Sequence, residues 1–275
     1  MGHFGLPYME NGIWMERDKA DQAIDMPALH THPCHEIYFL LSGARRFFVD
    51  HKIFDVLPGD LVVLPEGSLH RTIAPGSEGF ERYVLYFRES DIEEWIKDIG
   101  REEFSAFLES GCIQLSPEYR DAVRKDLHRI EREQMQKNPF SKVFIKNLLE
   151  HILLYAIRYG KIKSREKEEG ADKIQAVAHY ISQNYGSEIS LGDMANMAFM
   201  EKTYFSKRFK QLTGFGFKEY LIETRVQAAK QMLVTSAKSV TEIADACGFS
   251  SSNYFGDVFK RLVGVSPAQY RKEEK

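Results

Sequence analysis

Three histidines and one glutamate near the start of the chain have the types and spacing of metal ligands. His30 and His32 are followed by Glu36, and His70 comes later in the sequence. Alternate side chains of a strand point to one face, so residues 30, 32 and 36 would share a face on a continuous strand, although Pro33 interrupts it. Imidazole and carboxylate groups together suit Fe, Mn, Ni or Zn. We expect these four residues to form one site with the donor groups of a divalent metal site.

The later part of the chain contains an internal repeat. The stretch that begins at Ser190 aligns with the stretch from Ser239, and seven of the 17 positions from 204 to 220 are identical to those 50 residues further on. Chance would give about one identity in such a window. Each copy has the pattern of a short helix, a tight turn and a second helix. The repeat therefore predicts two helix-turn-helix units.

The second helix of each copy has two different faces. In the first copy Phe205, Phe209 and Leu212 form an apolar stripe that must be buried. A helix-turn-helix inserts the opposite, polar face into the major groove of double-stranded DNA. The polar set is Thr203, Ser206, Lys207 and Lys210 in the first copy and Asn253, Gly256, Asp257 and Lys260 in the second. The basic residues expected to neutralise phosphates are Arg208, Lys210, Lys260 and Arg261. The alternative is a helical bundle in which the polar face is simply solvated. The presence of two copies joined by one helix disfavours this alternative.

The elements that must position these residues change character along the chain. Short apolar runs separated by turn signals over residues 24–89 predict a small antiparallel barrel or sandwich. Ser116 followed by Pro117 predicts a helix start, and a second helix is expected over residues 140–159. Everything after Asp172 has helical periodicity. We therefore predict a two-domain α+β protein, in which a β-barrel with flanking helices precedes an all-α domain with two helix-turn-helix units.

A charged segment marks the boundary between the two parts. We assign residues 1–160 to the first domain, 161–171 to a linker and 172–275 to the second domain. The 275-residue chain has 37 Lys and Arg against 40 Asp and Glu, and this net charge of −3 by itself argues against a nucleic-acid binder. Residues 172–275 hold 14 basic and 11 acidic residues, net +3, whereas the remainder holds 23 against 29, net −6. The basic part is thus the part that carries the repeat.

The second part resembles the DNA-binding domain of the AraC/XylS-type transcriptional regulators, in which a long helix joins two helix-turn-helix units. The matching stretches in the second copy are Ile243-Ala244, Cys247-Gly248-Phe249, Tyr254-Phe255, Phe259-Lys260, Gly264, Ser266-Pro267 and Tyr270-Arg271. The resemblance implies that bases are read by Thr203, Ser206 and Lys207 in the first unit and by Ser252, Asn253 and Asp257 in the second. It also implies a homodimer formed through the helices at about 117–160.

Two departures from the pattern of these regulators concern the helix-turn-helix units. Phe199 stands in the first unit where the pattern has a glycine. The second recognition helix carries Gly256 and the acidic Asp257 where basic or amide residues are frequent. An aspartate can accept a hydrogen bond from cytosine N4 but repels phosphate. The sequence preference of the second helix is therefore left open.

The spacing around the histidines resembles the paired motifs of cupins, small β-barrels that often bind a metal through three histidines and a glutamate. AraC-type regulators often carry a degenerate cupin that senses a small molecule and holds no metal. The resemblance thus leaves open whether His30, His32, Glu36 and His70 bind a metal or line an effector pocket. Because cupin-bearing regulators commonly serve carbohydrate metabolism, a sugar is the first expectation for the effector. His35 would point to the other face.

Other features limit the class of protein. Three cysteines, none in a CxxC pair, are too few for a disulfide framework. No stretch approaches the roughly 20 apolar residues that cross a bilayer, and the start of the chain lacks the pattern of a signal peptide. We expect a cytoplasmic regulator that has no membrane partner, binds DNA, responds to a small effector and is no enzyme. The alternative is a metal-dependent cupin enzyme with a helical assembly domain.

Overall fold

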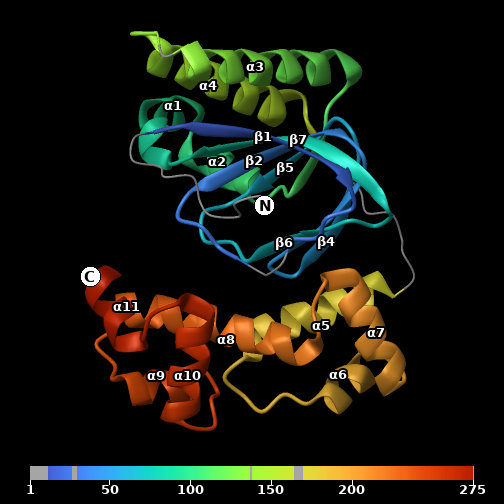
Figure 1. Ribbon diagram of the computed structural model, residues 1–275, viewed down its shortest axis with the longest axis vertical. Coiled ribbons are helices and arrows are strands. Elements are labelled where there is room, and N and C mark those ends of the chain that lie inside the picture. Colours follow the sequence, from blue (N-terminus) through green and yellow to red (C-terminus); the bar gives the residue numbers. More distant parts are fainter. Residues whose placement is uncertain (1–11, 27–29, 137, 164–169, 275) are drawn as a thin grey trace. The chain divides into compact units, whose positions relative to one another are not determined.

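The computed structural model describes residues 12–26, 30–136, 138–163 and 170–274. The chain divides into two compact units, Met1–Glu166 and Lys167–Lys275. The first contains two sheets with flanking helices and the second contains helices throughout (Figure 1). The predicted order of a sheet-rich part and an all-helical part is confirmed.

Two antiparallel sheets form the centre of the first unit. The larger sheet has the strand order β1-β7-β2-β5-β8-β9, and the smaller has the order β4-β3-β6. The strands of the larger sheet are β1 (Trp14–Gln22), β7 (Glu78–Phe87), β2 (His35–Ser42), β5 (Asp60–Leu64), β8 (Cys112–Gln114) and β9 (Lys161–Ile162). Those of the smaller are β4 (Lys52–Val56), β3 (Arg45–Val49) and β6 (His70–Ile73). The two sheets face one another as the walls of a small barrel (Figure 1).

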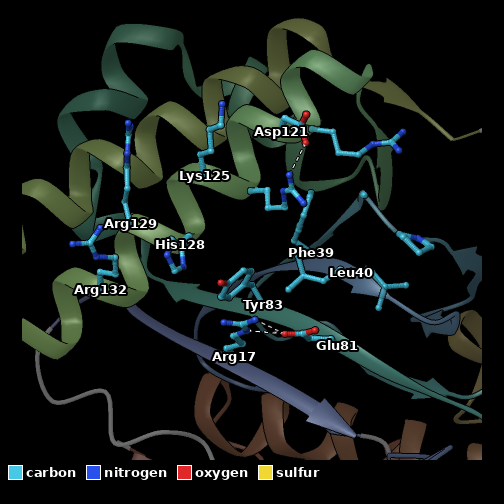
Figure 2. Close-up of a pocket in the computed structure, with 15 residues that line it drawn as sticks. Arg17, Phe39, Leu40, Glu81, Tyr83, Asp121, Lys125, His128, Arg129 and Arg132 are labelled. Carbon is cyan, nitrogen blue, oxygen red and sulfur yellow. Dashed lines mark hydrogen bonds and ion pairs between the residues drawn. The ribbon is translucent and has the colours of Figure 1, made fainter. Parts of the chain in front are cut away.

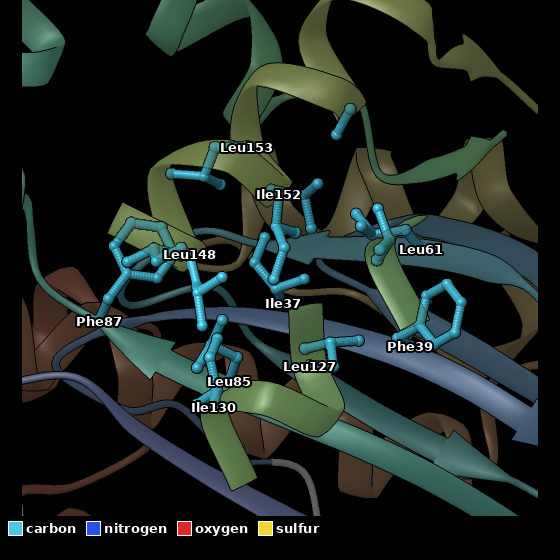
Figure 3. Packing of buried hydrophobic residues seen from close by; sticks show 14 of the residues in the cluster. Ile37, Phe39, Leu61, Leu85, Phe87, Leu127, Ile130, Leu148, Ile152 and Leu153 are labelled. Carbon is cyan, nitrogen blue, oxygen red and sulfur yellow. The ribbon is translucent and has the colours of Figure 1, made fainter. Parts of the chain in front are cut away.

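Alternate residues of β2 serve two different cores, which explains why this strand is apolar on both faces. Tyr38 and Leu40 pack into the barrel between the two sheets. Ile37 and Phe39 point outward and pack against helices, as Figure 3 shows. The helices of this outer core are α1 (Glu93–Ile99), α2 (Arg101–Leu108), α3 (Pro117–Gln136) and α4 (Ser141–Tyr159), with a short 3₁₀ turn, η1 (Glu89–Asp91), before them. Helix α3 begins at the predicted Pro117.

The segment that we predicted as a linker starts inside the first unit. Lys161–Ile162 form β9, which pairs with β8 at the edge of the larger sheet. Lys163 follows, and its ammonium group donates to the buried Asp60 carboxylate at 2.6 Å and to the Asp55 carbonyl at 3.0 Å. Residues 164–169 lie outside the described residues, and α5 begins at Ala171. The sequence showed the charges of this segment but not that one of them neutralises a buried carboxylate.

The second unit repeats one arrangement of helices twice. After α5 (Ala171–Asn184), the first helix-turn-helix consists of α6 (Leu191–Met197) and α7 (Lys202–Thr213). Helix α8 (Phe217–Thr235) leads to the second, which consists of α9 (Val240–Ala246) and α10 (Ser252–Val263), and α11 (Pro267–Glu274) follows. Among the described residues, none of the helices combines the length and the apolar character needed to cross a bilayer.

Candidate functional sites in the barrel and on the recognition helices

The predicted histidine and glutamate side chains meet in one cluster. The ligand-type atoms of His30, His32 and His70 all lie within 4.8 Å of one another. Glu36 places a carboxylate oxygen 3.0 Å from His32 Nε2 and 3.9 Å from His70 Nε2. His32, Glu36 and His70 are buried, and His30 is partly buried. The structure therefore brings all four predicted residues together.

The path of the chain to this cluster differs from the predicted one. Strand β2 begins only at His35, so His30 and His32 do not lie on the strand that carries Glu36. Instead His30 forms an isolated bridge with His70 at the start of β6, and its backbone exchanges two hydrogen bonds with that residue. Pro33 cannot donate to a strand ladder, so the chain leaves the strand there. Cross-strand pairing, rather than alternation along one strand, assembles the cluster.

Backbone carbonyls fix the orientation of two of the rings. His32 Nδ1 lies 2.8 Å from the Cys34 carbonyl, and His70 Nδ1 lies 3.0 Å from the Ser68 carbonyl. A carbonyl only accepts, so both Nδ1 atoms carry protons and both Nε2 atoms face the cluster. Metal-binding histidines are usually held in this way through the second ring nitrogen. His70 Nε2 is buried and has no hydrogen-bond partner within the described part of the chain, as expected of an atom that awaits a ligand.

The charges of the cluster fall on His32 and Glu36. Burial lowers the pKa of His32, but its hydrogen bonds to Cys34 and Glu36 outweigh burial and raise the pKa above the ordinary value. Burial raises the pKa of Glu36, but the opposing effects, of which the hydrogen bond from His32 is the largest, outweigh burial and lower the pKa below the ordinary value. Burial lowers the pKa of His70 to about 3, so this ring is neutral. A neutral imidazole beside a carboxylate is the donor set that divalent metals take.

His35 serves the fold on the other face of β2, as we predicted. Its Nδ1 accepts a hydrogen bond from the Glu66 amide at 3.0 Å, and its ring packs against Phe87 and Phe104. Cys34 is buried, with its Sγ atom 3.4 Å from His32 Nδ1.

The barrel interior contains two arginines that the sequence analysis did not single out. Arg45 is 2% exposed and donates to the Ile24 carbonyl and to Thr72. Arg82 lies over the Tyr38 ring at 5.3 Å, and Tyr86 meets the His32 ring edge-on at 5.6 Å. A signal was available for Arg82, because it shares parity with the inward-facing Phe80 and Val84 of β7. Of these groups, Tyr86 contacts the histidine cluster directly.

The predicted apolar stripe of α7 is buried, and most of the corresponding residues of α10 are buried too. Phe205, Phe209 and Leu212 of α7 are 0% exposed, and so are Phe255 and Phe259 of α10. Leu262, which corresponds to Leu212, is 40% exposed, and Val258 is buried in α10 instead.

The turn of each helix-turn-helix requires a left-handed backbone. Gly248 has φ +76° in the second unit, and Phe199 has φ +54° at the corresponding place in the first. Glycine adopts this conformation without strain, whereas a bulky side chain rarely does. Phe199 is also 86% exposed, so little burial compensates for the strain. The departure at Phe199 thus leaves the geometry of the turn intact at a cost in energy.

Both recognition helices present three polar side chains at the same spacing. Thr203, Lys207 and Lys210 on α7 correspond to Asn253, Asp257 and Lys260 on α10, and all six are exposed, as is Arg261. Three other predicted contacts, Ser206, Arg208 and Ser252, are partly buried. Arg208 donates to Gln211 on its own helix at 3.0 Å, and Thr241 of α9 donates to the Ser252 hydroxyl at 3.5 Å.

Two features of the recognition helices were missed from the sequence. Tyr204 and Tyr254 occupy corresponding positions and are 51% and 45% exposed, so each unit also offers an aromatic side chain. Their identity in the repeat was the available signal. The helix caps also differ, because Glu201 accepts from the Thr203 and Tyr204 amides, whereas Ser251 caps α10. These hydrogen bonds lower the pKa of Glu201, so the N-terminus of α7 carries a negative charge.

A barrel with a cluster of ligand-type side chains, joined to a domain with two exposed recognition helices, is the architecture of a DNA-binding transcription regulator. Residues 19–153 match the family of AraC-like ligand binding domains, and residues 194–273 match a helix-turn-helix domain family. The chain belongs to the AraC family of helix-turn-helix transcriptional regulators.

Individual relatives are distant. An uncharacterized HTH-type transcriptional regulator of Staphylococcus aureus is 28% identical over 243 residues, which are 86% of this chain but only 31% of that protein. The regulator YijO of Escherichia coli K12 is 23% identical over 220 residues, 79% of this chain and 75% of that one. The DNA-binding domain of AdpA, solved in complex with a target DNA, is 34% identical with a TM-score of 0.36, and covers 37% of this chain and 91% of its own. This chain thus spans less than a third of the staphylococcal relative.

Proposed function

We propose that the chain binds double-stranded DNA by inserting α7 and α10 into the major groove. The observation that carries this proposal is an exposed polar triplet at corresponding positions of both helices. It consists of Thr203, Lys207 and Lys210 on α7 and of Asn253, Asp257 and Lys260 on α10. Amide, carboxylate and ammonium groups at this spacing can reach base edges, and Lys210, Lys260 and Arg261 can neutralise phosphates.

Gel shifts with a DNA site selected by the full chain from a random pool test this assignment. Lys207→Ala with Asn253→Ala should weaken binding to the selected site but change binding to unrelated DNA much less, because base contacts carry the sequence preference. Lys210→Ala is the matched comparison, since loss of a phosphate contact should weaken binding to both DNAs alike. Unchanged affinity of the double variant for the selected site would show that other residues read the bases.

We further propose that a second copy of the chain covers the outer face of α4. Phe140 before this helix and Val143, Phe144 and Leu154 on it are 76%, 61%, 48% and 40% exposed, which forms an apolar stripe on a domain surface. In a dimer with a two-fold axis, this stripe would pack against the same stripe of the second copy. Phe144→Glu should convert a dimer into a monomer in light scattering, whereas Lys142→Glu on the same helix should not. A wild-type monomer at high concentration would refute the dimer.

We propose that His30, His32, Glu36 and His70 form the sensing site of the barrel and hold a divalent metal. The fixed rings of His32 and His70, the unsatisfied His70 Nε2 and the adjacent carboxylate support this assignment. Such a metal would supply a Lewis-acidic centre for a hydroxyl or carboxylate of an effector. The barrel's own residues do the rest, because Arg82 and Tyr86 beside the cluster can orient a polar ligand such as a sugar.

Metal analysis of the purified chain tests the barrel site without reference to activity. The wild type should retain about one equivalent of metal, Glu36→Gln and His70→Ala should lose it, and His128→Ala, which changes an exposed histidine, should keep it. Folding of each variant is checked by circular dichroism. If folded Glu36→Gln and His70→Ala variants bind a sugar as the wild type does, the cluster does not serve sensing. Turnover of a substrate by the metal-loaded barrel would favour the enzyme instead of the sensor.

A further inference from the structure

Two tyrosines at corresponding positions of the recognition helices are not among the proposed base and phosphate contacts. Tyr204 is the third residue of α7, and Tyr254 is the third residue of α10. Their side chains are 51% and 45% exposed, so each helix leaves about half of a large aromatic side chain in solvent. The surroundings of the two side chains show what each of them can bind.

Both rings lie beside the proposed base-reading face of their helix, not on it. An α-helix turns by about 100° per residue, so Tyr204 lies between the direction of Thr203, which is exposed, and that of Phe205, which is buried. Tyr254 has the same place on α10, because the repeat aligns the two helices. When the polar face of such a helix lies in the major groove, its border meets the wall of the groove. This wall is the sugar–phosphate backbone.

The hydroxyl groups of these two tyrosines are free to bind a ligand, because neither makes a hydrogen bond with any residue that the structure describes. Two other tyrosines use this group within the chain. The Tyr83 hydroxyl, seen near Arg17 in Figure 2, donates to the Glu131 carboxylate at 3.0 Å. The Tyr220 hydroxyl, which belongs to the same unit as the recognition helices, donates to the Ala178 carbonyl at 3.5 Å.

Packing and charge distinguish the two positions. The Tyr254 ring packs edge to face against the Phe249 ring, with the centroids 6.1 Å apart, so less side-chain entropy is lost when it binds. The neutral hydroxyl of Ser251 accepts from the Tyr254 amide at 3.2 Å. At the same place on α7, the Glu201 carboxylate accepts from the Tyr204 amide at 3.0 Å. A phosphate is therefore repelled at Tyr204 and not at Tyr254.

We propose that the Tyr254 hydroxyl donates a hydrogen bond to a DNA phosphate at the wall of the major groove, and that the Glu201 carboxylate keeps Tyr204 from doing the same. This inference rests on the proposed function, because α10 must first enter the groove. Neutral side chains such as tyrosine commonly donate to phosphates in protein–DNA interfaces. Such a contact fixes the position of the helix on the DNA, but it carries no sequence information and neutralises no charge.

Gel shifts of the full chain at several salt concentrations test the proposal, with the selected DNA site and an unrelated duplex. Tyr254→Phe removes only the hydroxyl and should weaken binding to both DNAs alike, by about threefold or more. The slope of log affinity against log salt should stay unchanged, because no charge is lost. Lys210→Gln is the matched comparison, since loss of a charged phosphate contact should reduce the slope by about 0.9.

The corresponding variant of the first unit tests the role of Glu201. Tyr204→Phe should leave DNA affinity unchanged in the wild-type chain and should weaken it in a Glu201→Ser chain, where the carboxylate is absent. Because both tyrosine hydroxyls lack partners in the described part of the chain, each phenylalanine variant should keep the wild-type free energy of unfolding in urea.

Several results would overturn the inference. These are an unchanged affinity of Tyr254→Phe, a loss confined to the selected site, a changed free energy of unfolding, or an equal loss for Tyr204→Phe in the wild-type chain. A wild-type chain that binds no DNA would refute the proposed function itself. If Lys210→Gln reduces the salt slope while Tyr254→Phe binds as the wild type does, only the inference about Tyr254 fails.

Discussion

The turn of the second helix-turn-helix offers a quantitative test of the structure through Gly248→Ala. Gly248 has φ +76°, and a Cβ atom there would lie 2.8 Å from the carbonyl oxygens of Gly186 and Tyr185 and 2.9 Å from Arg225 Nη2. Gly264, at the end of α10, has φ +91° but nothing within 4 Å of its Cβ position. The two glycines share left-handed strain and differ in the space around them.

The expected costs follow from this difference. The left-handed conformation of an alanine costs roughly 1 to 2 kcal/mol, which is the whole expected effect of Gly264→Ala. At Gly248 the new methyl group also displaces the Arg225 guanidinium, which donates to the Tyr185 and Ser187 carbonyls at 2.8 and 2.9 Å. Loss of one hydrogen bond from a charged group costs about 1.5 to 3 kcal/mol. Gly248→Ala should therefore destabilise the helical unit by about 2.5 to 5 kcal/mol.

Urea unfolding of the full chain, followed by circular dichroism, measures both variants against the wild type. The helical signal of the second unit should be lost at a lower urea concentration in Gly248→Ala than in Gly264→Ala, with an unchanged slope. Arg225→Ala provides a check, because Gly248→Ala should cost less in a chain where no guanidinium is displaced. Equal costs for the two glycine variants would refute the argument that crowding, rather than backbone strain alone, requires a glycine at this turn.

Three further predictions concern single side chains. Phe199 is 86% exposed and has a left-handed backbone, which strains a bulky residue. Phe199→Gly removes this strain and should stabilise the first helix-turn-helix by up to about 1 kcal/mol in the same urea assay. A loss of stability would contradict the presence of backbone strain at this position. Burial and the neighbouring Glu219 raise the pKa of Glu223 from 4.5 to about 7. The unfolded chain therefore loses this proton at a lower pH than the folded chain does, and the free energy of unfolding falls between pH 4.5 and about pH 7. Glu223→Gln should therefore raise the melting temperature at pH 8 and not at pH 4, and a pH-independent difference would count against it. Lys163→Met leaves the Asp60 carboxylate buried without its cation and should cost about 3 kcal/mol, whereas Lys161→Met, at an exposed position, should cost little.

The sequence predicted those features that depend on local pattern. The repeat placed both helix-turn-helix units, and the apolar stripe with Phe205 and Phe209 gave the buried face of α7 correctly. Ser116 and Pro117 marked the start of α3 because capping and the fixed φ of proline act within one turn. The four residues of the barrel cluster were also identified, since their chemistry is visible in their types.

Features that depend on contacts between distant segments were not predicted. The His30–His70 bridge joins residues from separate parts of the chain, and alternation along one strand could not reveal it. Lys163 belongs to a charged run, and nothing in that run distinguishes it as the partner of the buried Asp60.

The caps and triplets of the two recognition helices, though built on one repeat, give the DNA-binding unit a direction. Helix α7 begins with the carboxylate of Glu201 and carries Lys207, while α10 begins with the neutral Ser251 and carries Asp257 at the corresponding position. A base that suits an ammonium group does not suit a carboxylate. If the DNA site were reversed, α7 would meet the bases that suit α10, and α10 would meet those that suit α7. If α7 and α10 read bases as proposed, the chain distinguishes the two orientations of its site, and each bound copy points one way along the double helix.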